Sequence, residues 1–238
     1  MQQINYDIKR KNLYESVAEN LEEMILNDAS QIGQKLPSEQ TLATNFGVSR
    51  NVIRESLKIL QERQLITLQV GEGAYIKKPD DQSITDMLNR VIVMENIDPI
   101  KIYEMRSILE INACRLAAQK GCSAQEIGEL ERINEEMRIW QHDIDKRTEL
   151  DIEFHSYIAH ISGNPLLELF ERSITRLVSP VIRTALLPTS GNENGIRDHH
   201  EMIQVLKKGD SDQAAQLMYE HIRKSTQNYL DGANLQNN

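Results

Sequence analysis

Residues 36–62 read LPSEQTLATNFGVSRNVIRESLKILQE, a stretch that predicts two short helices joined by a glycine turn. Ser38 is a good N-cap for the first helix, because its hydroxyl can accept a hydrogen bond from a free backbone N–H group. Gly47 ends that helix, and Ser49 can cap a second helix that the apolar spacing predicts over residues 50–62. This arrangement indicates a helix-turn-helix.

The segments on either side complete a larger unit. Apolar residues at helical spacing predict a first helix over residues 11–27. After the helix-turn-helix, residues 66–70 alternate like a strand, residues 71–73 make a Gly-Glu-Gly turn, and residues 74–76 return as a second strand. Three helices followed by a hairpin predict a winged helix-turn-helix.

The exposed face of the helix over residues 50–62 carries groups that suit DNA. Arg50 and Arg54 are four residues apart and share one face, so both can enter a major groove, where arginine reads guanine or contacts phosphate. Asn51 can read a base edge, and Ser49 with the first N–H groups of the helix can meet a phosphate. The alternative is that two arginines on an exposed helix merely keep it solvated.

The charge of the chain is divided unevenly. A net charge of −9, from 27 basic and 36 acidic residues, is unusual for a protein that binds nucleic acid. Residues 1–79 hold ten basic and ten acidic residues, whereas residues 80–238 hold 17 and 26, so the second part carries the whole excess. All six histidines also lie in the second part. This division predicts two modules with different partners.

The composition excludes several classes of protein. Apolar residues make up 39% of the 238 residues and charged residues 26%, which is typical of a globular protein. No stretch approaches the roughly 18 consecutive apolar residues of a membrane-spanning helix, and residues 1–10 lack the apolar core of a signal peptide. Cys114 and Cys122 do not make a disulfide framework. We therefore expect a cytoplasmic protein with no membrane partner.

Helix signals, without a convincing strand, follow one another after residue 81. They are the cap and proline at Asp98-Pro99 and again at Asn164-Pro165, a capping box at Ser123-Ala124-Gln125-Glu126, and the stop and start at Gly209-Asp210. Short turns between helices favour antiparallel neighbours. We expect a mainly α protein, whose second module is an antiparallel all-α bundle of six or seven helices.

Polar residues on apolar helix faces are the candidate metal ligands of the second module. Asp151 and His155 are separated by one helical turn and share a face. His199 lies on an inward stripe, whereas its neighbour His200 aligns with an outward one. His221 also follows an inward stripe, and two antiparallel helices joined near residue 209 would bring it within about one turn of the level of His199.

This set of side chains has a definite chemical preference. One carboxylate and three imidazoles suit a divalent transition metal, because calcium and magnesium prefer all-oxygen shells. Zinc is the first choice, with nickel and manganese as alternatives. The other explanation of these residues is structural: buried histidines often donate to carbonyl groups, and Asp151 can cap or pair locally.

The first module resembles the GntR family of bacterial transcription regulators. The motifs that carry the resemblance are Leu36-Pro37-Ser38-Glu39, Leu42-Ala43, Phe46-Gly47-Val48-Ser49-Arg50, Val52, Arg54-Glu55 and Leu57. The resemblance implies that Arg50, Asn51 and Arg54 face DNA and that Gly71 lies at the tip of the wing. Gln40 and Glu72 stand where the family usually has basic residues, which weakens the expected contacts with phosphate. We therefore expect recognition-helix contacts without a strong wing contact.

The second module resembles the FadR C-terminal (FCD) domain of the FadR subfamily. The motif is Asp151-x-x-Phe154-His155, followed by Asp198-His199 and, 22 residues after His199, by His221. The resemblance implies a metal held by Asp151, His155, His199 and His221. It also implies that a small organic acid binds beside the metal and alters the affinity for DNA.

Two further polar residues are candidates for contacts with this acid. Arg106 lies on a helix face that should be mostly buried, so its guanidinium needs an acidic partner, either Glu110 or a bound carboxylate. The resemblance places an arginine near the effector pocket at this position. Asn134 lies on another inward stripe and could donate to the same ligand, although such a residue is more often a satisfied core amide.

Three classes of function compete on this sequence. The first is a dimeric regulator, most simply a repressor, that binds a palindromic operator in double-stranded DNA and responds to a small organic acid. The second is a metal-dependent enzyme acting on a small carboxylate, which lacks an evident general base because Glu153 points away from the ligand face. The third is a DNA-binding protein without an effector, or a nonspecific architectural one. We predict the first, and no enzyme.

Overall fold

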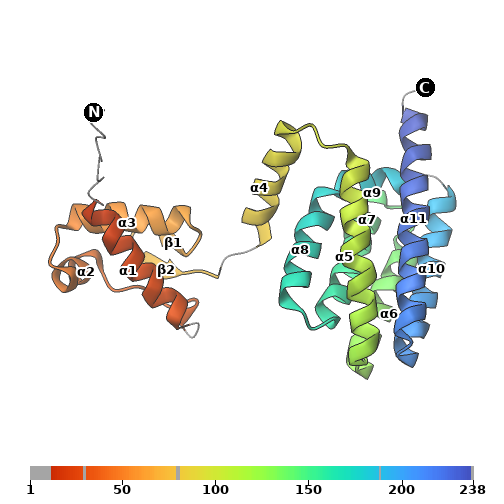
Figure 1. Ribbon diagram of the computed structural model, residues 1–238, viewed down its shortest axis with the longest axis horizontal. Coiled ribbons are helices and arrows are strands. Elements are labelled where there is room, and N and C mark those ends of the chain that lie inside the picture. The colour runs from red at the N-terminus through yellow and green to blue at the C-terminus, as the bar shows by residue number, and fades with distance from the viewer. Residues whose placement is uncertain (1–11, 29–30, 79–80, 188, 237–238) are drawn as a thin grey trace, which may run out of the picture. The chain divides into compact units, whose positions relative to one another are not determined.

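The computed structural model describes residues 12–28, 31–78, 81–187 and 189–236, with eleven helices and two strands among them. Contacts within the chain divide it into two compact units, Met1–Ser83 and Ile84–Asn238, which are considered separately (Figure 1). None of the helices in the described ranges is sufficiently long and apolar to cross a membrane.

The first unit is the expected winged helix-turn-helix. Its elements are α1 (Leu13–Asn27), α2 (Glu39–Phe46), α3 (Arg50–Glu62), β1 (Ile66–Gln69) and β2 (Gly73–Ile76). α1 and α2 both pack against α3. Their shared core includes Leu21, Ile53 and Leu60, which are fully buried. α2 is too short to be stable alone, so it depends on the burial of this apolar surface against α3.

The turn between α2 and α3 forms as its sequence requires. Ser38 accepts a hydrogen bond from the backbone N–H of Thr41 at 3.1 Å. Gly47 ends α2 with φ of +64°, a left-handed conformation that glycine adopts without steric cost. Ser49 then caps α3 by accepting from the backbone N–H of Val52 at 3.3 Å. These caps set the direction in which α3 leaves the turn.

The hairpin differs from its prediction by one residue at two of its ends. β1 ends at Gln69 rather than at residue 70, and β2 begins at Gly73 rather than at residue 74. The two strands pair antiparallel, with Gln69 opposite Gly73, so the turn needs three residues between them. Val70 therefore leaves the ladder and is fully exposed, and Gly71 takes φ of +79°.

The second unit is an all-helical bundle. Its elements are most of α4 (Asp81–Met94), which begins three residues before the unit boundary, and the whole of α5 (Pro99–Lys120), α6 (Ala124–Ile139), α7 (Ile144–Ile161), α8 (Pro165–Leu177), α9 (Ser179–Ala185), α10 (Thr189–Lys208) and α11 (Ser211–Gln236). The expected caps are present: Asn164 accepts from two backbone N–H groups of α8, and Asp210 accepts from that of Gln213.

The described part of this bundle has eight helices rather than the expected six or seven. α8 and α9 follow each other directly in the sequence and are separated only by Val178. Pro180 lies in the first turn of α9, and proline has no N–H group to continue the hydrogen bonds of α8. The hydrogen bonds of α8 therefore do not continue into α9, and residues 165–185 form two helices.

The centre of the bundle lies among α5, α7, α10 and α11 (Figure 1). α11 runs along α5, and α7 lies against α5, α6 and α8. The core there, to which α6 also contributes, consists mainly of small and branched apolar side chains with three methionines, and Phe154 of α7 is fully buried in it. Polar side chains that enter this core from four different helices therefore meet in a space from which water is excluded.

Candidate metal centre and DNA interface

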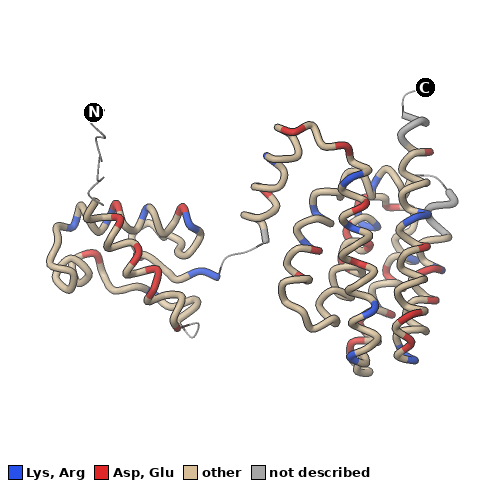
Figure 2. The backbone as a smooth tube through the Cα atoms, viewed as in Figure 1, with Lys and Arg blue, Asp and Glu red and all other residues tan. Residues whose placement is uncertain are grey.

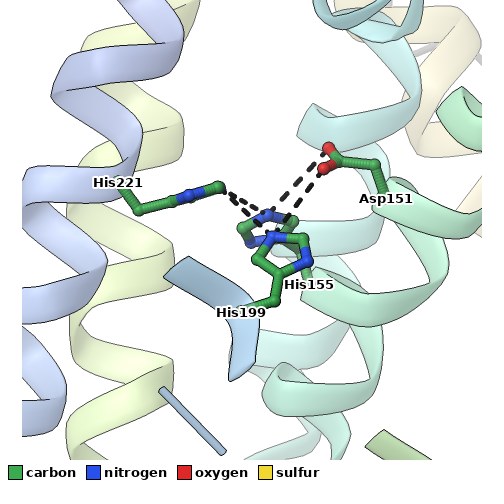
Figure 3. Close-up of side chains that lie close together, drawn as sticks. All are labelled: Asp151, His155, His199 and His221. Atoms are coloured by element: carbon green, nitrogen blue, oxygen red, sulfur yellow. Dashed lines mark hydrogen bonds and ion pairs between the residues drawn. The ribbon is translucent and has the colours of Figure 1, made fainter. Parts of the chain in front are cut away.

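The four predicted metal ligands come together in the core of the second unit (Figure 3). Asp151 and His155 lie one turn apart on α7, His199 comes from α10, and His221 comes from α11. All four are buried, and one ligand atom of each lies within 4.8 Å of those of the others. Residues up to 70 positions apart thus converge on one point.

The three imidazoles present the same nitrogen to this point. The Nε2 atom of His221 lies 3.2 Å from that of His155 and 3.4 Å from that of His199. The carboxylate oxygens of Asp151 lie 3.8 Å from Nε2 of His199 and 4.0 Å from Nε2 of His155. Donors bound tetrahedrally at about 2.1 Å from a zinc ion would be separated by about 3.4 Å. The nitrogen spacing fits one shared cation.

Hydrogen bonding alone does not explain three nitrogens facing one another. A single N–H···N bond can satisfy one pair, and the lone pair of the third nitrogen then faces its neighbours without a proton between them. Buried polar atoms left in this way are costly, so proteins normally supply a partner. A cation accepts all three lone pairs, and the carboxylate of Asp151 offsets part of its charge.

Carboxylates lie behind two of the imidazoles. The Nδ1 atom of His155 is 2.5 Å from Oε2 of Glu110, and Nδ1 of His221 is 3.8 Å from Oδ2 of Asp198. His155 Nδ1 and Glu110 Oε2 are close without the geometry of a hydrogen bond. A proton on an Nδ1 that faces a carboxylate would leave the lone pair on Nε2, which is the tautomer that binds a metal. Lys224 contacts Asp198 at 2.8 Å and pairs with its charge.

His199 is held differently. Its Nδ1 atom is buried, has no hydrogen-bond partner in the described part of the chain, and is not paired with a carboxylate there. Its ring instead stacks on Phe154, with centroids 3.9 Å apart and planes inclined by 9°. Burial, together with the charges of neighbouring histidines and arginines, lowers the pKa of His199 well below its ordinary value. Burial also lowers the pKa of His221, against the opposing effect of Asp198. Both rings are therefore neutral, the form that binds a metal.

Arg106 of α5 lies against this cluster and is 1% exposed. Its Nε atom donates to Glu110, and its Nη2 atom lies 3.7 Å from the carboxylate of Asp151. Burial would raise the pKa of Glu110, but Arg106 and His155 outweigh it and lower that pKa to about 2. Arg106 thus has an internal acidic partner, and its two terminal nitrogens make no hydrogen bond to a described residue.

Arg147 is a second buried arginine, and it was not among the residues predicted for the site. It is 2% exposed, and its Nε and Nη2 atoms have no hydrogen-bond partner among the described residues. Burial lowers its pKa, against the charge of Asp151, and its own charge acts on His199. The signal was available, because Arg147 lies one helical turn before Asp151 on the same face of α7.

The other polar candidates lie outside the cluster. The amide nitrogen of Asn134 donates to the backbone carbonyl of Ile196 at 3.2 Å, so it ties α6 to α10. His200 is exposed, as its outward stripe predicted. Glu153 is exposed and pairs with Arg132 at 2.7 Å, on the side of α7 away from Asp151. Cys114 packs in the core.

Glu171 of α8 is a buried carboxyl whose ionisation should affect stability. It is 1% exposed, and Thr175 donates a hydrogen bond to it at 2.7 Å. Burial, reinforced by the charge of Glu110, raises the pKa of Glu171 from its ordinary 4.5 to about 7. The stability contributed by the neutral carboxyl is therefore complete below pH 4.5 and is lost as the pH rises to 7.

Replacing Glu171 by glutamine should remove this loss. We expect the gain in unfolding free energy of Glu171→Gln over the wild type to be about 2–3 kcal/mol larger at pH 8 than at pH 5, measured by urea unfolding. Glu201→Gln should follow the wild type at both pH values, because Glu201 is exposed in the folded protein. Parallel pH profiles for Glu171→Gln and the wild type would show that Glu171 is ionised throughout.

The predicted DNA contacts lie on one side of the first unit. Arg50 and Arg54 are both more than half exposed, on the face of α3 away from the core. Asn51 and Ser49 are exposed at the amino-terminal end of the same helix. A groove of about 600 Å³ lies between the start of α2, α3 and the hairpin, and its lining includes both arginines and Gly71.

The charge of the remaining surface supports this orientation. The sequence of α1 has four glutamates and no basic residue, so α1 is an acidic helix (Figure 2). Phosphate groups would be repelled from that helix and attracted to α3. The wing has Glu72 next to Gly71, both exposed, and Lys35 approaches the hairpin, with its ammonium 6.0 Å from the ring of Tyr75.

Comparison with known proteins finds relatives that match both parts of the chain. The family described as "Bacterial regulatory proteins, gntR family" matches residues 13–76, and the FCD domain matches residues 101–224. The HTH-type transcriptional regulator LutR of Bacillus subtilis is 31% identical, over 84% of this chain and 93% of its own. The HTH-type transcriptional repressor NanR of Cronobacter sakazakii is 28% identical, over 90% of this chain and 84% of its own.

A solved structure supports the same relationship. Streptococcus agalactiae GntR is 25% identical, with a TM-score of 0.71, and the match covers 90% of this chain and 99% of that one. These relatives are transcriptional regulators and not enzymes, which sets aside the alternative of a metal-dependent enzyme.

Proposed function

Since the chain belongs to the GntR family of bacterial regulatory proteins and has an FCD domain, we propose that it is a repressor controlled by a small organic acid. In this proposal residues 1–79 read DNA, and residues 80–238 bind a metal and the acid and hold two chains together. The relative NanR is named a transcriptional repressor, which supports repression over activation in this proposal.

One observation carries the sensing part of the proposal: three buried Nε2 atoms and the carboxylate of Asp151 converge on one point. Nitrogen donors favour a divalent transition metal, with zinc as the first choice and nickel or manganese as alternatives. Such a metal would supply a positive charge to which the carboxylate of an acid can bind. The chain's own residues orient the ligands through Glu110, Asp198 and Phe154.

Buried arginines beside the ligands support an acidic effector. The terminal nitrogens of Arg106, and Nε and Nη2 of Arg147, are donors without hydrogen-bond partners among the described residues. Two guanidinium groups can bind a carboxylate through paired, charge-assisted hydrogen bonds. Asn134 remains a candidate through its buried Oδ1 atom, which has no partner in the described ranges and could accept from a hydroxyl group of the acid.

The reading part of the proposal rests on α3. Two chains would present two such helices to half-sites of a palindromic operator, about one helical turn of DNA apart or a multiple of it. Arg50, Asn51 and Arg54 would contact base edges and phosphates, with Ser49 at the start of the helix beside a phosphate. Gly71 would approach the neighbouring minor groove. Binding of the acid changes DNA affinity only if it favours one arrangement of the two modules.

Arg147 offers a test of the effector site, because a buried arginine kept for a ligand is costly when the ligand is absent. We expect Arg147→Met to leave the Tm of the acid-free protein unchanged or higher, and to abolish the Tm increase caused by acids. The measurement is thermal unfolding of the metal-loaded protein with a panel of short hydroxy and keto acids.

Lys146→Met is the matched control, because Lys146 is adjacent, has a side chain that is 42% exposed, and pairs with Glu149 at 3.0 Å. It should respond to the acids as the wild type does. Retention of the full acid response in Arg147→Met would remove Arg147 from the effector site. A strong loss of stability without acid would give it a structural role instead.

A further inference from the structure

An acidic residue lies between the two arginines of the reading face. Glu39 of α2 contacts Arg54 of α3 through Oε2, at 2.9 Å from Nε. The same oxygen lies 3.5 Å from Nη2 of Arg50. Its side chain is 32% exposed, whereas those of Arg50 and Arg54 are 55% and 53% exposed. One carboxylate is therefore shared by both of the basic residues assigned to DNA.

A glutamate at position 39 can serve two roles, and the two roles require different side chains. As the first residue of α2, after the cap Ser38, it suits the positive end of the helix dipole. Any acidic side chain would serve that purpose. Reaching α3 requires a glutamate of full length, and the contact spans 15 residues of sequence. Glu39 also lines the groove in which DNA would lie, where its charge repels phosphate.

The atoms used in the contact leave Arg54 ready to read a base. Glu39 binds the Nε edge of the guanidinium, and no described residue pairs with the two terminal nitrogens of Arg54. Arginine recognises guanine through two N–H groups directed at O6 and N7. A carboxylate behind the guanidinium holds it in one orientation, and the side-chain freedom that is otherwise lost on binding is reduced. Arg50 is held more loosely, through a terminal nitrogen at the longer distance.

On DNA without the guanine that Arg54 would read, the charge of Glu39 lowers the affinity. Without a guanine at the right place, Arg54 gains most by turning to a phosphate. That turn breaks the contact with Glu39, and the phosphate then lies near the freed carboxylate. Binding to any duplex benefits from neutralised phosphates, so a carboxylate that occupies two arginines lowers nonspecific affinity more than specific affinity.

We propose that Glu39 is a positioning residue that sets the DNA specificity of this chain. It holds Arg54 for guanine and makes contact with phosphate less favourable where guanine is missing. The proposal rests on the proposed function, in which Arg50 and Arg54 face DNA. It adds a residue that touches neither base nor phosphate and acts through the arginines.

The experiment compares three variants of the full-length chain. The first, Glu39→Gln, removes the charge, and the second, Glu39→Asp, keeps the charge at the start of α2 but shortens the reach. The control, Glu55→Gln, removes the same charge from the unit as Glu39→Gln does. Glu55 lies exposed on α3 and pairs with Lys58 at 2.8 Å instead of with Arg50 or Arg54. The probes are the tightest duplex selected by the wild type from a random library and a scrambled duplex of equal length. Circular dichroism verifies folding.

We expect Glu39→Gln to bind the scrambled duplex more tightly, with a salt dependence steeper by about one ion per chain. The ratio of its affinities for selected and scrambled duplex should fall about tenfold. Glu39→Asp should lose affinity for the selected duplex with little change for the scrambled one. Glu55→Gln should keep the wild-type ratio.

Equal ratios in Glu39→Gln and Glu55→Gln would overturn the proposal. So would wild-type behaviour of Glu39→Asp, because charge at the helix start would then be sufficient. Failure of the proposed function has a different signature: the wild type selects no sequence, or Arg54→Ala binds the selected duplex as well as the wild type does.

Discussion

The His199→Ala variant is expected to lose its bound metal while keeping its affinity for DNA. In the proposed metal centre His199 would supply one of four ligand atoms, and it is fully buried, so no side chain on the surface can replace it. Loss of residues that merely support ligands typically costs 10- to 100-fold in metal affinity, and loss of a ligand should cost more than about 100-fold. Metal analysis of the purified protein and titration with zinc measure this directly.

Stability should follow the metal. A ligand present at about 1,000 times its Kd stabilises a folded protein by about 4 kcal/mol, so zinc should raise the Tm of the wild type and not that of His199→Ala. The selected DNA duplex should bind metal-free wild type and His199→Ala equally, because α3 belongs to the other compact unit.

The neighbouring residue provides the control for this experiment. His200→Ala removes an imidazole one position away, but His200 is exposed on the outer side of α10. It should bind zinc as the wild type does. Asp151→Asn should also lose the metal. Because asparagine retains the shape of the aspartate side chain, a loss of metal in this variant is not explained by a loss of folding. Stoichiometric metal with unchanged affinity in His199→Ala would falsify the metal centre.

Arg54→Ala is expected to give the largest loss of operator affinity among the residues of the first unit. A paired arginine–guanine contact contributes about 1–3 kcal/mol of discrimination, and a dimer on a palindrome makes two such contacts. The affinity for the selected duplex should therefore fall by between about 30-fold and 10⁴-fold. The scrambled duplex should lose much less, because phosphate contacts do not depend on sequence.

Lys58→Ala is matched to this variant. Lys58 is exposed and lies one turn further along α3, and its replacement by alanine removes the same charge as Arg54→Ala does. We expect a small and similar loss on both duplexes, as for a residue that contributes only to the general attraction of phosphate. Competition binding with both duplexes at several salt concentrations measures the two effects separately. An equal loss on both duplexes in Arg54→Ala would make Arg54 a phosphate contact and not a base reader.

Several features of the site could be predicted from residue spacing because helices repeat so regularly. A separation of four residues on one helix places Asp151 and His155 on one face in any fold. The turn at Gly209 limits how far apart His199 and His221 can lie along their helices. The choice of His199 over His200 followed from which stripe is apolar, and burial of the first and exposure of the second agree with it.

Contacts between side chains of different helices could not be predicted from residue spacing. The contact of Glu110 with His155 joins α5 to α7, and that of Glu39 with the arginines joins α2 to α3. No periodicity relates positions on different helices, because the angle and separation of two helices depend on the side chains packed between them. The number of helices in the second module was also missed, because α9 follows α8 with only Val178 between them and has a proline in its first turn.

The order of local signals alone determined the class of this protein: caps, glycine stops and apolar spacing are properties of neighbouring residues, and they were sufficient for a winged helix-turn-helix followed by a helical bundle. Tertiary structure decided which charges meet across helices. Arg106 of α5 lies 3.7 Å from the carboxylate of Asp151 of α7, although the two positions are 45 residues apart. Charge pairing falls off over a few ångströms, so it depends on packing between distant segments and not on their sequence separation.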